Sequence, residues 1–98
     1  MESSVKNFPK IDVRTAVGLA DKYFKDLKDM IGSSSIGSVR LEEVELSEDK
    51  QFWLITLGFD RENSHTPLKL APQYIREYKI FKINAETGEV ESMKIREL

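Results

Sequence analysis

The sequence contains no cysteine among its 98 residues. A chain without cysteine has no disulfide framework, no thiolate nucleophile and no zinc–thiolate site. Its one histidine, His65, lies in a polar segment, and no serine stands in a Gly-x-Ser-x-Gly motif. The glycines form no phosphate-binding pattern, and no calcium or zinc motif is present. We therefore expect a protein that is not an enzyme and that uses no cofactor or metal.

Long apolar runs are also missing. The first nine residues lack the apolar segment of a signal peptide, and no run of 18 apolar residues occurs in the chain. The sequence thus predicts a cytoplasmic protein, or a domain excised from a longer exported chain, and no membrane partner.

The chain has no large excess of charge of either sign. Lys and Arg number 15 against 17 Asp and Glu, and a net charge of −2 gives no electrostatic basis for binding nucleic acid. Basic and aromatic residues alternate over residues 74–96, but the acids Glu77, Glu91 and Glu97 interrupt that pattern, so no nucleic-acid partner is expected. Acids are concentrated in residues 40–62, which we interpret as a solvent-exposed strand edge and its turn.

The clearest positive signal is an apolar helical stripe. Residues recur at spacings of three and four along it, namely Val13, Val17, Ala20, Phe24, Leu27 and Ile31, and it is widened by Ala16, Leu19, Tyr23 and Met30. Asp12 is a suitable N-cap and Gly32 a suitable C-terminal stop. These signals predict a helix from about Val13 to Ile31.

Alternating strand patterns follow the helix. They predict strands over residues 39–46, 51–60, 74–84 and 89–96. The segment Ser47 to Lys50 forms a polar hairpin turn, and in the last hairpin Asn84 caps the turn while Gly88 supplies a positive φ. Gly58, inside the second strand, indicates a bulge or the close approach of the helix or another backbone.

A helix followed by four strands predicts one α+β domain. Without β-α-β alternation, the expected fold is one long N-terminal helix packed on a four-stranded antiparallel sheet, in the order α-β-β-β-β. This domain spans residues 12–98. Residues 1–11 are predicted to form a loose N-terminal arm, with Val5, Phe8 and Ile11 as its anchors on the body.

Two segments resemble the PepSY domain family and its propeptide relatives. They are the capped helix opening at residues 11–13, with Ala16 and Ala20 on the inner side, and the hairpin of residues 81–90. In that family the hairpin reads as an acidic or amide residue, two variable residues, then Thr-Gly-Glu/Lys-Val, as Asn84 to Val90 does here. The resemblance implies a non-catalytic binding or inhibitory module, with no catalytic residues to transfer.

The second predicted strand is apolar on both of its faces. One face, suited to the helix, consists of Trp53, Ile55, Leu57 and Phe59. Phe52 and Leu54 point the other way, and on the third strand Tyr78 and Ile80 alternate with Phe81 and Ile83. If the two strands are neighbours, the sheet face away from the helix carries an apolar patch made of Phe52, Leu54, Tyr78 and Ile80.

Two interpretations of this apolar patch stay open. In the first, the arm (Val5, Phe8) or the long loop (Leu68, Leu70) folds back over the patch. In the second, the patch is a surface for self-association or for a partner. Other polar clusters have simpler explanations: Asp60, Glu62 and His65 as solvent-facing residues after a strand, and Glu43 with Glu45 as an exposed acidic row.

The sequence therefore predicts a non-enzymatic protein-interaction or inhibitory module that acts through the sheet face or edge. Its partner would be another protein or, in a homodimer, a second copy. The alternative is a small-ligand-binding domain that uses the gap between the helix, the sheet and the loop of residues 61–73.

Overall fold

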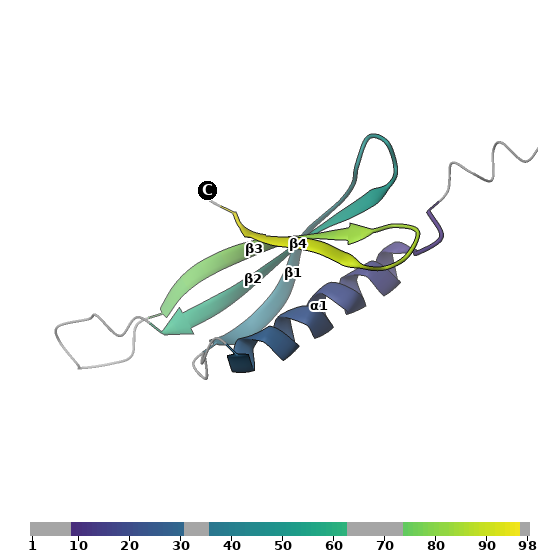
Figure 1. The fold of residues 1–98 in the computed structure, drawn as a ribbon. Helices are drawn as coiled ribbons and strands as arrows, with labels where there is room; N and C mark the ends of the chain where they lie inside the picture. The colour runs from purple at the N-terminus through teal and green to yellow at the C-terminus, as the bar shows by residue number, and fades with distance from the viewer. Residues whose placement is uncertain (1–8, 31–35, 63–73, 97–98) are drawn as a thin grey trace, which may run out of the picture.

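The computed structural model shows one helix laid across an antiparallel sheet (Figure 1). It describes residues 9–30, 36–62 and 74–96. The elements are α1 (Val13–Met30), β1 (Ile36–Leu46), β2 (Phe52–Glu62), β3 (Tyr74–Asn84) and β4 (Val90–Ile95). The strands lie in the order β1-β2-β3-β4, and each neighbouring pair is antiparallel. The predicted α+β fold is confirmed, with strand ends shifted by only a few residues.

The helix begins where the sequence predicts. The Asp12 carboxylate accepts a hydrogen bond of 2.8 Å from the Thr15 amide, and the Asp12 carbonyl accepts the Ala16 amide at 3.0 Å. The Thr15 amide hydrogen bond lowers the pKa of Asp12, as expected for a carboxylate at a helix N-terminus. The predicted stop at Gly32 lies outside the described residues.

The buried stripe of α1 is narrower than the apolar pattern suggests. Its centre is Ala16, Ala20 and Phe24, which recur every four residues and are buried. Val13 is 40% exposed, Tyr23 is 38% exposed and Met30 is 80% exposed, so their predicted burial in the stripe is wrong. Val13 and Met30 lie in the terminal turns of the helix, whereas Tyr23 lies at the margin of the stripe with its ring edge-on to that of Phe81.

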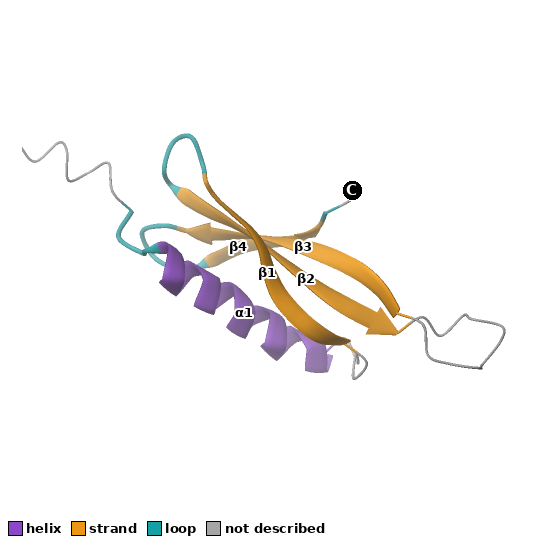
Figure 2. Cartoon of the chain, turned by 180° about the vertical axis from the view of Figure 1, so that it is seen from behind, coloured by secondary structure: helices purple, strands orange, loops and turns teal. Residues whose placement is uncertain are grey.

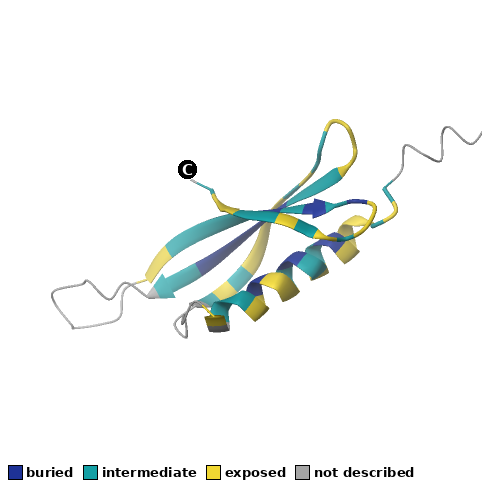
Figure 3. Cartoon of the chain, viewed as in Figure 1, coloured by how far each residue is buried: buried dark blue, intermediate teal, exposed yellow. Residues whose placement is uncertain are grey.

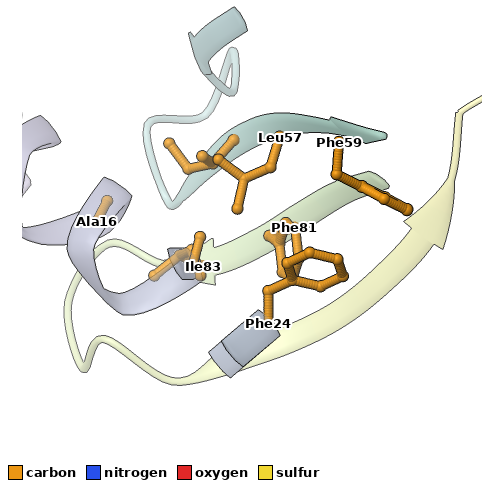
Figure 4. Packing of buried hydrophobic residues seen from close by; sticks show 8 residues of the cluster. Ala16, Phe24, Leu57, Phe59, Phe81 and Ile83 are labelled. Carbon is orange, nitrogen blue, oxygen red and sulfur yellow. The ribbon is translucent and has the colours of Figure 1, made fainter. Parts of the chain in front are cut away.

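The core forms between α1 and the central strands (Figures 3 and 4). The ring of Phe24 lies 4.9 Å from that of Phe59 and 6.1 Å from that of Phe81, measured between centroids. Ile55 and Ile83 complete the contact from β2 and β3. The small residues Ala16 and Ala20 supply the N-terminal part of this contact on the helix, and the three phenyl rings fill the part of the core around Phe24.

The chain before the helix is attached to the sheet at Ile11. The Ile11 amide donates to the Ala85 carbonyl at 2.8 Å, and the indole Nε1 of Trp53 donates to the Ile11 carbonyl at 2.7 Å. The Ile11 side chain also packs against the core. Ile11 is thus the anchor that the sequence predicts, whereas Val5 and Phe8 lie outside the described residues.

Side-chain caps close both predicted hairpins. In the first, the Ser47 hydroxyl donates to Asp49 and, together with the Gln51 amide, lowers the pKa of that carboxyl group. In the second, the Asn84 side-chain oxygen accepts two turn amides, and Gly88 adopts a φ of 82°. A positive φ favours glycine because it has no Cβ. The predicted turn chemistry of the last hairpin is therefore confirmed.

Candidate interaction surface

The sheet face turned away from α1 carries the predicted apolar patch. In the register of β2 and β3, Leu54 pairs with Lys82, Thr56 with Ile80, and Gly58 with Tyr78. Paired residues of an antiparallel sheet point to the same side, opposite to that of their sequence neighbours. Because Ile55 and Phe81 face α1, these six residues face away from it.

We call this side of the sheet the open face. Figures 1 and 2 show α1 lying across the other side of the sheet only. Within residues 9–30, 36–62 and 74–96, no helix or strand covers the open face. The predicted covering segments of Val5 and Phe8 and of Leu68 and Leu70 fall outside these ranges, so that interpretation stays a prediction.

All four residues of the apolar patch are half-buried. Leu54 and Ile80 are diagonal neighbours on adjacent strands, and Tyr78 precedes Ile80 by two residues on β3. Phe52 lies at the hairpin end, where the Nζ atom of Lys82 sits 4.2 Å from its ring centroid. The Lys82 side chain therefore shields the Phe52 end of the apolar patch, and the centre of the patch is formed by Leu54 and Ile80.

One arginine joins three strands on the open face. The Arg76 guanidinium on β3 donates to Asp60 on β2 and to the Ser38 carbonyl on β1, both at 3.1 Å, and it also donates to Glu42 on β1. Its carbon Cζ lies 6.0 Å from the ring centroid of Tyr78. The hydrogen bond to Glu42 and the charges of both carboxylates raise the pKa of Arg76. Sequence reasoning missed this network because it depends on strand register.

A second ion pair crosses the whole sheet. Arg96, just after β4, donates to Glu43 on β1. Thr56, which pairs with Glu43 and Ile80, is only 3% exposed although it lies on the open face. Burial there indicates that long side chains fold over the middle of the face. The interpretation of the acids as a solvent-exposed edge is therefore incomplete, because several of them bind arginines across the sheet.

Gly58 leaves room for the Arg76 network. A Cβ added at Gly58 would lie 2.6 Å from a carboxylate oxygen of Glu42 and 2.8 Å from a guanidinium nitrogen of Arg76. Register irregularities of β1 lie on both sides of the Arg40–Gly58 pair, between Gly37 and Arg40 and between Leu41 and Glu43, while β2 pairs regularly with β3 at Gly58. Of the two predicted reasons for this glycine, a bulge is present but lies on the partner strand, and the atoms nearest to an added Cβ belong to charged side chains rather than to the helix or another backbone.

Replacing Gly58 with alanine is expected to destabilise the fold by about 1 kcal/mol, because the methyl group displaces the Glu42–Arg76 ion pair. An interior strand glycine replaced without a clash would instead gain stability. Gly37→Ala on β1 is the matched control, since a Cβ there has no atom within 4 Å. Urea denaturation measures both variants, and equal changes would contradict this role of Gly58.

Of the other polar residues singled out in the sequence, some form ion pairs and some lie outside the described residues. Asp60 binds Arg76, whereas His65 and the side chain of Glu62 are outside the described residues. Glu43 and Glu45 share the open face, as predicted, and Glu43 binds Arg96. In the described part of the chain, no three His, Asp or Glu side chains are grouped to hold a metal ion.

Near the loop of residues 61–73, the structure describes only the flanking strand ends. There Arg61 donates to Glu77 at 2.7 Å, and this hydrogen bond lowers the pKa of Glu77. The rest of the gap predicted for a small ligand lies outside the described residues. None of the described helices is long and apolar enough to cross a membrane.

The sheet edges are poorly suited to strand addition. The outer strand β1 has two register irregularities, between Gly37 and Arg40 and between Leu41 and Glu43. The opposite outer strand, β4, has six residues. Bulges, charges and shortness each discourage pairing with another chain at an edge. The open face is therefore a better candidate contact surface than either edge.

Comparison of the chain with family models, curated proteins and solved structures found no match. The resemblance to PepSY domains accordingly stays a prediction drawn from the helix opening and the last hairpin.

Proposed function

We propose that the protein is a non-enzymatic module that binds, or inhibits by binding, a protein partner through the open face. The observation that carries this proposal is the position of Leu54, Tyr78 and Ile80. They lie in the middle of a sheet face that no described element covers, and they are half-buried rather than fully covered. An apolar centre surrounded by charged groups is the usual composition of a protein-binding surface.

The charged groups around the apolar patch also favour a protein partner. Acidic residues of β1 lie along one margin of the open face, and basic residues of β3 and β4 lie along the other. Such a surface is specific for a partner with the complementary arrangement, because a wrong partner would bring like charges together.

Site-specific photocrosslinking in the native host tests this proposal. A photoreactive phenylalanine analogue replaces Tyr78, which has a similar size and lies on the open face. In a matched control the analogue replaces Lys22, an exposed residue on the outer side of α1. We expect a discrete protein adduct from position 78 and none from position 22.

Comparison of the adducts from positions 22 and 78 shows whether the protein binds a partner through the open face. Equal labelling at positions 22 and 78, or no adduct from a folded protein at position 78, would refute binding through the open face. Circular dichroism of each purified variant shows that the fold is retained.

A further inference from the structure

We propose that the partner at the open face is a second copy of this chain, packed face to face about a two-fold axis that runs parallel to the strands. This inference rests on the proposed function and names its partner. Two sheets in such a pair have nearly aligned strands, which is a common way for sheet faces to pack. The axis direction follows from the charge distribution.

The open face has opposite charges at its two margins. Glu42, Glu43 and Glu45 lie on β1, and Arg40 is the base among them. The other margin, formed by β3, β4 and the residue after β4, carries Arg76, Lys82, Lys94 and Arg96. Arg76 and Arg96 bind Glu42, Asp60 and Glu43 of the same chain, so among the described residues the charges of opposite sign left for a contact between copies are Glu45 on one margin and Lys82 and Lys94 on the other. Glu91 lies at the hairpin end of β4, where the Asn84 side chain donates to it at 3.3 Å.

Rotation about an axis parallel to the strands exchanges the two margins. The acidic β1 of one copy then faces the basic β4 of the other, and the apolar centre around Leu54 and Ile80 faces its own equivalent. A two-fold axis in the same plane but perpendicular to the strands would place β1 on β1 and bring acids together. Charge complementarity therefore selects the parallel axis.

Two exposed residues are suited to make this contact. Glu45 pairs with Leu54 across β1 and β2, and Lys94 pairs with Ile80 across β4 and β3, so they flank the apolar centre from opposite sides. Both are exposed, and within the described ranges neither forms an ion pair. In the proposed dimer, Glu45 lies near Lys94 of the second copy, and this contact occurs twice.

The size of the face implies weak, concentration-dependent association. Strands of 11 residues are about 35 Å long, and four strands together are about 15 Å wide. Such a face buries on the order of 500 Å² per copy, and the total of about 1,000 Å² is near the lower limit for a specific interface. Sedimentation equilibrium over a range of concentrations is therefore the appropriate measurement.

The test uses the full chain and the charge reversals Glu45→Lys and Lys94→Glu. Each variant alone places like charges at both contacts, so its dimer dissociation constant should rise about tenfold. An equimolar mixture of the two variants restores opposite charges at both contacts in the heterodimer. We expect the mixture to dimerise about as tightly as the original chain.

Three outcomes would overturn the inference. They are a monomeric original chain at every concentration, single variants that still dimerise normally, and a mixture that fails to regain dimerisation. A monomer whose Leu54→Asp variant unfolds would also count against the exposed interface and favour the interpretation that another part of the same chain covers the open face. A photoadduct from position 78 with a different protein would refute the second copy while supporting the proposed function, whereas a homodimer adduct would have twice the mass of 11.3 kDa.

Discussion

Replacing Phe24 with alanine is expected to lower the free energy of unfolding by about 3 to 5 kcal/mol. The Phe24 side chain is 1% exposed, and its ring contacts those of Phe59 and Phe81. Its removal loses the burial of a large apolar group and leaves a cavity that α1 cannot close without moving. Since a domain of this size is stabilised by about 5 to 15 kcal/mol, the variant should be close to unfolding.

Urea denaturation, followed by the fluorescence of the single tryptophan, Trp53, measures this loss. Trp53 is a suitable probe because it is half-buried and hydrogen-bonded to Ile11. Met30→Ala is the matched control, since it removes an apolar side chain from the same helix at a position that is 80% exposed. Its effect should stay within about 0.5 kcal/mol. Equal losses in the two variants would contradict a core centred on Phe24.

Local patterns were sufficient to predict the fold. Helical spacings of three and four and a strand period of two reflect which side of an element is buried, and Asp12, Asn84 and Gly88 mark ends and turns through their own chemistry. The same patterns overestimated the burial of Val13 and Met30. A helical period gives the direction of a side chain but not how far the sheet extends beneath it.

The open face was predicted less completely. Alternation was sufficient to place Leu54 and Ile80 on the side away from the helix. It could not show that Arg96 reaches Glu43 or that Thr56 is buried, because both depend on residues far apart in sequence. They depend on register, on the β1 bulge and on the twist of the sheet.

Among charged residues, Arg76 is expected to contribute most to stability. Arg76→Met should lower the free energy of unfolding by about 2 kcal/mol, although methionine retains much of the aliphatic packing. The Arg76 side chain is 21% exposed, while those of Glu42 and Asp60 are 32% and 35% exposed. Removing the guanidinium leaves both carboxylates without this cation and close to each other, and partial contact with water limits the loss.

Arg61→Met is the matched control for Arg76→Met. Arg61 also joins β2 to β3, but it binds one carboxylate, Glu77, and is more exposed, so its loss should cost less than about 1 kcal/mol. Adding Asp60→Asn to Arg76→Met removes one uncompensated carboxylate, and the double-mutant cycle should show a coupling of about 1 kcal/mol.

The loss of stability caused by Arg76→Met should also become smaller at about 1 M salt, where exposed charges are screened. If both methionine variants lose the same stability at all salt concentrations, the ion pairs across the open face do not act as a network.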